Sequence, residues 1–248
     1  MKIGILQADH VSEPLREVHG DYDAMFQVLL GEVDPTLTFA VYPVVDGVFP
    51  GSTAECDAWL ITGSRYGTYD DEPWIGPLRE FIRHIVADGG RVVGICFGHQ
   101  LLADTLGGES GKSAKGWGVG LQRWEPFAAV LDDELVPTGL KLLASHQDQV
   151  RRLPAEAIRI AGSAFCENAA FRIGDQVMAF QGHPEFTRAY SRDLMNLRRG
   201  RIPDEVVDAG LASLQDAPDR AEVAAWMVRF LRGEASAPQV SPGDGTAP

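Results

Sequence analysis

The segment of residues 91–106 constrains the fold of this chain more than any other, because it places a cysteine in a sharp turn between a strand and a helix. A strand-like run over 91–95 leads into Gly-Ile-Cys-Phe-Gly at residues 94–98, and a helical pattern follows over 99–106. Glycines on both sides of the cysteine suit a turn so tight that a β-carbon beside it would clash. Turns of this kind present a nucleophile at the top of the sheet in α/β folds.

The first 106 residues alternate between strand-like and helical segments. Short apolar runs predict buried strands, and apolar residues at helical spacing predict helices. The expected strands are 3–8, 37–43, 58–62 and 91–95, and the expected helices are 23–30, 74–86 and 99–106. This alternation predicts an α/β fold with a mostly parallel sheet that is covered by helices on both faces.

The pattern changes after residue 118. Short strand-like runs over 119–124, 141–144, 158–163, 169–173 and 177–180 predict antiparallel additions and a return to the main sheet, and helical stretches follow over 187–199, 203–214 and 220–231. We expect residues 1–233 to form a single domain with C-terminal helices. Residues 234–248 contain little besides Ser, Ala, Pro and Gly, which predicts a disordered tail because such a segment buries too little apolar surface to offset its ordering entropy.

Composition excludes several classes of function. The net charge of −13 over 248 residues argues against a nucleic-acid partner, which requires a positive surface. Three cysteines provide no disulfide framework, so a reducing, cytoplasmic setting is expected, and no apolar run approaches the roughly 20 residues of a membrane span. The chain has no phosphate-binding loop, no dinucleotide fingerprint and no metal-ligand pattern, so neither a cofactor nor a metal is predicted.

Cys96 is the candidate nucleophile. At a helix N-terminus, unpaired backbone N–H groups and the helix dipole favour the thiolate over the thiol. The N–H of Phe97 is the nearest candidate donor to an oxyanion, and Gly63, at the end of the strand 58–62, could supply a second. Cys56 and Cys166 lack this context and are interpreted as structural or incidental.

His183 is the candidate base among six histidines. It follows the expected strand 177–180 within Gln-Gly-His-Pro-Glu, and the end of a strand is where an open α/β sheet presents its site. Glu185 could accept the proton of one ring nitrogen and so fix the tautomer. A second polar run, Ser-His-Gln-Asp-Gln-Val at 145–150, is interpreted either as part of a substrate pocket or as a hydrophilic turn.

Gly-Ile-Cys-Phe-Gly-His-Gln together with Gly-His-Pro-Glu resembles the class I glutamine amidotransferase family over about residues 1–186. The resemblance implies a flavodoxin-like fold in which Cys96 attacks the γ-carboxamide carbon of a glutamine-like substrate and forms a γ-glutamyl thioester. His183 would then transfer protons and Glu185 would orient it. The resemblance also implies an oxyanion hole formed by the N–H groups of Gly63 and Phe97.

The resemblance extends to substrate-binding residues. Gln100 matches the glutamine that closes the family's elbow motif and is expected beside the substrate. His146 and Asp148 lie in a run similar to the pocket segment of the GMP synthase amidotransferase domain. The chain carries no ATP-binding half, and it has Thr-Gly-Ser-Arg-Tyr-Gly at 62–67 where biosynthetic members tend to have a Gly-Pro turn. It therefore resembles the stand-alone branch, which includes γ-glutamyl peptidases.

These observations predict an amidohydrolase that acts on glutamine or a γ-glutamyl compound, alone or with an ammonia-accepting synthetase. The C-terminal helices could form a homodimer surface. Two alternatives stay open: an enzyme of the same fold that acts on aldehydes or glyoxals, which usually places a carboxylate from another strand beside the cysteine, and a non-catalytic binding domain. Release of ammonia or glutamate would favour the amidohydrolase over the aldehyde enzyme. Failure of a glutamine analogue to label Cys96 would favour the non-catalytic domain.

Overall fold

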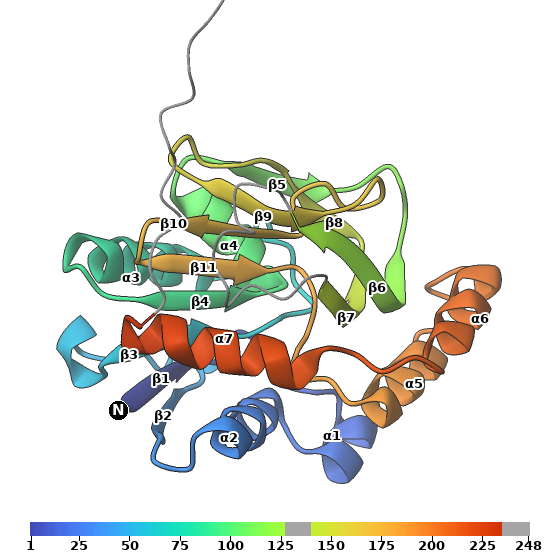
Figure 1. Cartoon of the computed structure of the whole chain (residues 1–248), viewed down its shortest axis with the longest axis horizontal. Helices are drawn as coiled ribbons and strands as arrows, with labels where there is room; N and C mark the ends of the chain where they lie inside the picture. Colours follow the sequence, from blue (N-terminus) through green and yellow to red (C-terminus); the bar gives the residue numbers. More distant parts are fainter. Residues whose placement is uncertain (127–139, 235–248) are drawn as a thin grey trace, which may run out of the picture.

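The computed structural model describes residues 1–126 and 140–234, and a large twisted sheet runs through the middle of this part (Figure 1). Its nine strands lie in the order β2 (Thr38–Tyr42), β1 (Lys2–Leu6), β3 (Ala58–Ile61), β4 (Val92–Ile95), β11 (Val177–Phe180), β10 (Ala170–Ile173), β9 (Ile158–Gly162), β6 (Gly118–Pro126) and β7 (Leu140–His146). A separate two-stranded sheet joins β5 (Glu109–Lys112) to β8 (Asp148–Arg152).

The strands from β2 to β11 are parallel, and those beyond β11 pair antiparallel. This arrangement confirms the predicted α/β fold with a mostly parallel sheet and antiparallel additions. The pairing of β4 with β11 matters most for function, because it aligns Ile95 with Phe180. The residues that follow these two strands, although far apart in the sequence, therefore leave the same edge of the sheet side by side.

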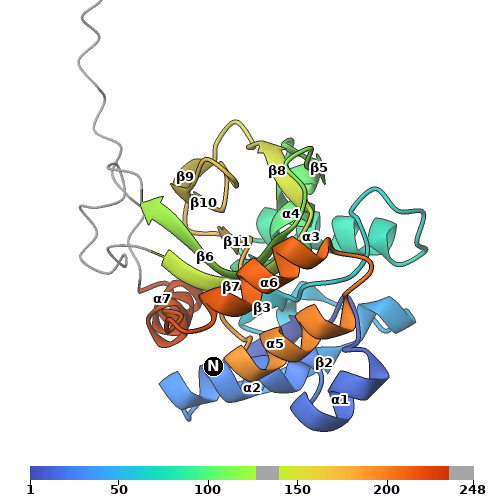
Figure 2. The same ribbon diagram turned by 90° about the vertical axis from the view of Figure 1, so that its right-hand side faces the viewer.

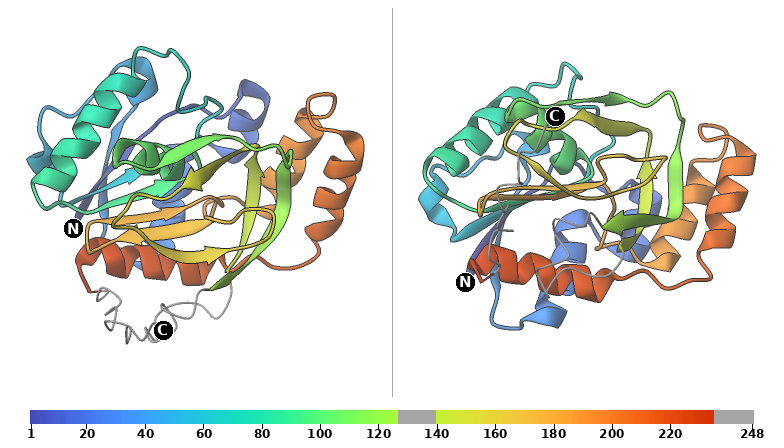
Figure 3. Two further views of the ribbon diagram at one scale, coloured as in Figure 1. Left: turned by 90° about the horizontal axis from the view of Figure 1, so that it is seen from above. Right: turned by 45° about the horizontal axis from the view of Figure 1, so that its top comes forward.

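Helices cover both faces of the sheet (Figures 1 and 3). The helices are α1 (Glu13–His19), α2 (Tyr22–Val33), α3 (Ile75–Ala87), α4 (Phe97–Thr105), α5 (Arg188–Leu197), α6 (Asp204–Ser213) and α7 (Arg220–Arg232). On one face, α2 and α7 bury apolar residues such as Phe26 and Trp226 against the strands, and on the other α3 and α4 bury residues such as Ile82 and Leu101. The hydrophobic core thus lies in two layers on either side of the sheet.

Helices α5 and α6 lie to one side, against β6 and β7, as Figure 2 shows. Tyr190 and Leu194 of α5 pack with Phe186, Leu143 of β7 and Leu15 of α1 in a small apolar cluster. This packing fixes the C-terminal end of α5 near the edge of the sheet at which the parallel strands end.

Besides two short 3₁₀ helices, Val44–Asp46 and Thr53–Glu55, the structure adds three elements that the sequence patterns did not predict: α1, β5 and β8. The polar run 145–150 joins two strands through a bend at Gln147, because Ser145 and His146 end β7 and Asp148 begins β8. Strands β5 and β8 are mostly polar and pair only with each other, so they lack the apolar alternation by which strands are recognised. Helix α1 has only seven residues and one buried side chain, too few to produce a periodic signal.

The predicted disordered tail, 234–248, lies outside the described residues except for Glu234. Within the described ranges, no helix is both long enough and apolar enough to cross a membrane.

Candidate active site

Cys96 forms the turn between β4 and α4 in a strained backbone conformation. Its φ of 53° and ψ of −97° make it the one non-glycine residue with a positive φ in the described chain. Hydrogen bonds hold it from both sides, since its N–H donates to the carbonyl of Phe180 at 2.8 Å and its carbonyl accepts from the N–H of Gln100 at 3.1 Å. Strain of this kind persists where the surroundings enforce it, and it is concentrated at functional sites.

The two flanking glycines are required by close backbone contacts. A β-carbon on Gly94 would lie 2.6 Å from the carbonyl of Gly98, and one on Gly98 would lie 2.6 Å from the carbonyl oxygen of Ile61. These contacts involve backbone atoms, which cannot move aside as the end of a flexible side chain can. The expected crowding at the turn is therefore present at both positions.

Replacing Gly98 with alanine is expected to lower the free energy of unfolding by roughly 1–3 kcal/mol, the usual cost of forcing an extra carbon into packed structure. The matched control is Gly76→Ala in α3, where an added β-carbon meets nothing within 4 Å and alanine suits the helix better than glycine. Denaturant unfolding of both variants measures the effect. Equal stability of the Gly98→Ala protein and the wild type would contradict the steric account of the turn.

His183 follows β11 and lies beside Cys96. Its Nδ1 is 2.7 Å from Oε1 of Glu185, and its ring and the β-carbon of Cys96 both lie within 4 Å of a β-carbon built on Gly63. The ring stacks on Phe186 with centroids 3.8 Å apart, and the N–H of His183 donates to the carbonyl of Leu143 at 2.8 Å. These contacts fix the imidazole with one nitrogen on the carboxylate and leave the other for the sulfur.

The charge state of His183 follows from its two neighbours. Burial opposes a charge on the ring, but the negative charges of Glu185 and Cys96 outweigh it and raise the pKa of His183 from 6.5 to about 10. The imidazole is therefore protonated at neutral pH. A protonated imidazole beside the sulfur can give a proton to a leaving group.

Gly63, at the end of β3, packs against both residues of this pair. A β-carbon on it would lie 2.7 Å from Cε1 of His183 and 3.6 Å from the β-carbon of Cys96. Phe97 is the first residue of α4, so its N–H has no partner within the helix. The ends of three neighbouring strands, β3, β4 and β11, thus bring Gly63, Cys96 and His183 to one place.

Gln181 is a member of the site that sequence patterns did not predict. Its side chain is completely buried, and its Nε2 lies 3.6 Å from Sγ of Cys96. The orientation of the amide is determined, because Nε2 of Gln100 donates both to the carbonyl of Asp148 and to Oε1 of Gln181. Gln181 therefore presents its NH₂ group to the sulfur, where it favours negative charge. Its place directly after β11, which is adjacent to β4, is the signal that could have identified it.

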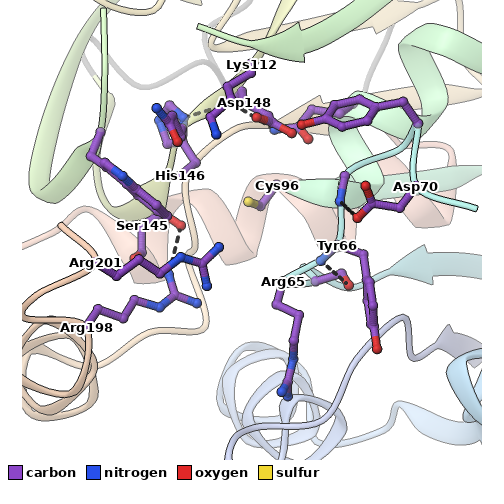
Figure 4. A pocket seen from close by; sticks show the side chains of 16 residues that line it. Arg65, Tyr66, Asp70, Cys96, Lys112, Ser145, His146, Asp148, Arg198 and Arg201 are labelled. Carbon is purple, nitrogen blue, oxygen red and sulfur yellow. Dashed lines mark hydrogen bonds between the residues drawn. The ribbon is translucent and has the colours of Figure 1, made fainter. Parts of the chain in front are cut away.

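A polar pocket of about 170 Å³ opens above Cys96 (Figure 4). Cys96 itself is only 6% exposed, so the turn does not project the thiol into solvent as the sequence suggested. The sulfur is instead reached through this pocket. Three of the predicted substrate-binding residues line the pocket, namely Gln100, His146 and Asp148, whereas Gly63 and Phe97 are not among its lining residues.

The pocket walls carry further charged and aromatic residues that no sequence pattern singled out: Tyr69, Asp70, Lys112, Trp117, Arg198 and Arg201. His146 is buried, which lowers its pKa to about 4, and its Nδ1 donates to the carbonyl of Asp148 at 2.9 Å. The pocket therefore contains a neutral imidazole together with groups of both signs.

The other cysteines and His99 have structural surroundings. Burial raises the pKa of Cys166 to about 12, and burial likewise raises the pKa of Cys56, so both remain thiols. His99 is buried against Phe171, and burial lowers its pKa to about 3. None of these three described residues lines the pocket above Cys96.

Known proteins resemble this chain over most of its length. Residues 52–195 match the family described as glutamine amidotransferase class-I. The chain is 30% identical over 233 residues to gamma-glutamyl peptidase 3 of Arabidopsis thaliana, which covers 90% of this chain and 93% of that protein. It is 32% identical over 213 residues to gamma-glutamyl peptidase 4 of the same plant, which covers 82% of this chain and 84% of that protein.

A solved structure supports the same fold. The crystal structure of a glutamine amidotransferase from Thermotoga maritima matches with a TM-score of 0.72 at 20% identity, and the match covers 94% of this chain and 99% of that one.

Proposed function

Because this chain belongs to the class I glutamine amidotransferase family, we propose that it is a cysteine-nucleophile hydrolase that cleaves the γ-amide bond of glutamine or of a γ-glutamyl compound. The observation that carries the proposal is the position of His183 beside Cys96, with its Nδ1 2.7 Å from Oε1 of Glu185. Similarity to plant gamma-glutamyl peptidases over most of the chain favours γ-glutamyl compounds.

In the first half of the proposed reaction, the thiolate of Cys96 attacks the γ-carbonyl carbon and a C–S bond forms. The carbonyl oxygen becomes an oxyanion, which the N–H groups of Gly63 and Phe97 would stabilise. The imidazolium of His183 then gives its proton to the leaving nitrogen as the C–N bond breaks. The products of this half are an amine or ammonia and a γ-glutamyl thioester on Cys96.

In the second half, His183 is neutral and takes a proton from water. The hydroxyl oxygen attacks the thioester carbon, the C–S bond breaks, and glutamate leaves. The sulfur departs as a thiolate and His183 is again an imidazolium, so the starting state is restored. Glu185 holds the ring in place through both halves and stabilises its charged form.

A substrate screen tests the proposal. Glutamine and a set of γ-glutamyl dipeptides are offered to the purified protein, and released glutamate, ammonia or amino acid is measured, with the Cys96→Ala protein as control. The proposal expects release of glutamate from at least one γ-glutamyl compound. If neither glutamine nor any γ-glutamyl dipeptide released glutamate, the proposal would be wrong.

Replacing Glu185 with glutamine is expected to lower kcat/KM by roughly 100-fold, which is less than the loss expected at Cys96. The amide keeps the shape of the buried side chain but removes the charge that raises the pKa of His183. Steady-state rates over a range of pH measure both effects. As the pH rises, the variant should lose activity at a lower pH than the wild type, because the pKa of its His183 is lower. A loss as large as that of Cys96→Ala would indicate that Glu185 has a further role.

A further inference from the structure

We propose that Arg198 and Arg201 form a subsite for a carboxylate on the leaving group of the substrate, so that the enzyme prefers γ-glutamyl peptides with a free C-terminus to their amides and to glutamine. The inference rests on the proposed function and adds a substrate class to it. The two arginines follow the C-terminal end of α5 and line the same pocket as Cys96 (Figure 4).

Both guanidinium groups are held in place by their surroundings. The carbon atoms at their centres lie 6.0 Å and 5.4 Å from the centroid of the Trp117 ring, for Arg198 and Arg201 respectively. Arg198 also donates to Oγ of Ser145 at 2.6 Å. The ring beneath both guanidinium groups and the hydroxyl beside one of them restrict the conformations of the two side chains. Binding of a ligand therefore costs less side-chain entropy.

Neither arginine has a carboxylate within 4 Å in the described part of the chain, although the protein has 35 acidic residues. Arg199, between them in sequence, pairs with Asp204 and Asp208. Arg65, on the same pocket, pairs with Asp9 at 2.8 Å. Two cations on one indole ring repel each other, and an anion bound between them would relieve that repulsion. The planar fork of arginine matches a carboxylate in particular.

The opposite wall of the pocket determines which part of the substrate these arginines would bind. Figure 4 shows Cys96 between the two guanidinium groups on one side and Asp70 on the other, with Asp148 and Lys112 at the top of the view. The two aspartates suit the α-ammonium of the glutamyl group. With the γ-carbonyl at Cys96, the leaving group then extends toward Arg198 and Arg201, and an amino-acid leaving group carries a carboxylate there.

The test compares γ-glutamyl-alanine, γ-glutamyl-alaninamide and glutamine. We expect kcat/KM of the wild type to be about 10-fold higher for the acid than for its amide, as one charge-assisted contact allows. In the Arg198→Gln and Arg201→Gln proteins the ratio of acid to amide should fall toward one. Arg201→Lys, which keeps the charge, should retain part of the preference, and Arg199→Gln is the matched control that should keep all of it.

Binding provides a readout that does not depend on turnover. In the Cys96→Ala protein, calorimetry should give tighter binding of the acid than of the amide, and adding Arg201→Gln should remove the difference. Equal affinity for acid and amide would overturn the subsite even if hydrolysis were observed. An equal loss for acid, amide and glutamine in Arg201→Gln would overturn it too, because the arginine would then bind the glutamyl group itself. Absence of hydrolysis with all three substrates, despite selective binding of the acid, would overturn the proposed function instead.

Discussion

The Cys96→Ala protein is expected to lose hydrolysis of γ-glutamyl substrates by at least about 10³-fold, the scale seen when a covalent nucleophile is removed. The reason is that, among the described residues, no other nucleophile lies both under the pocket and beside the imidazole of His183. Steady-state release of glutamate measures the loss. Thermal unfolding should show that the fold is retained, because alanine occupies less space than the side chain it replaces.

Cys166→Ala is the matched control for this variant. Cys166 is also buried, at 1% exposure, but burial raises its pKa to about 12 and it does not line the pocket. Its replacement should therefore leave kcat/KM close to that of the wild type. Wild-type turnover by Cys96→Ala, or a large loss in Cys166→Ala alone, would assign the nucleophile to another residue.

The His183→Gln protein is expected to lose about 10³-fold or more of kcat/KM, since it removes both the proton donor for the leaving amine and the cation beside the sulfur. Alkylation of Cys96 by iodoacetamide at neutral pH should also slow, which a purely structural role of His183 would not require. The matched control is His84→Gln on the exposed face of α3, which should change neither rate. Unchanged alkylation in His183→Gln would contradict the thiolate–imidazolium pair.

The same variant tests the charge of His183 through stability. The pKa of His183 in the wild type is raised from 6.5 to about 10, so the folded protein holds the imidazole proton more tightly than the unfolded chain does. The resulting stabilisation is complete below pH 6.5 and is lost as the pH rises to about 10. The difference in unfolding free energy between wild type and His183→Gln should therefore shrink across this window. A constant difference would mean that His183 is neutral in the folded state.

The sequence predicted the sheet and the turn because each produces a local pattern. Apolar runs mark the buried parallel strands, and the glycines on both sides of Cys96 mark the turn. The structure confirms that a β-carbon at either glycine would clash with backbone atoms. The closeness of His183 to Cys96 has a different origin, since it depends on β11 pairing with β4. No local pattern specifies that pairing, and only the combination of the two motifs suggested it.

The pocket walls could not be predicted for the same reason. Arg198 and Arg201 reach the pocket because Tyr190 and Leu194 pack α5 against Leu143 of β7. That contact is between segments distant in sequence, so the C-terminal helices carried no functional signal beyond their apolar periodicity. The sequence did not predict the strands β5 and β8, because their residues are mostly polar and do not alternate between apolar and polar.

Covalent trapping of the nucleophile tests the central claim most directly. The protein is incubated with a chloroketone analogue of glutamine, and the modified residue is identified by intact-mass measurement and peptide mapping. The account predicts one analogue per chain, attached to Cys96, with slower labelling when a γ-glutamyl peptide is present. Labelling of Cys56 or Cys166 in its place, or undiminished turnover by a protein whose Cys96 is fully modified, would contradict it.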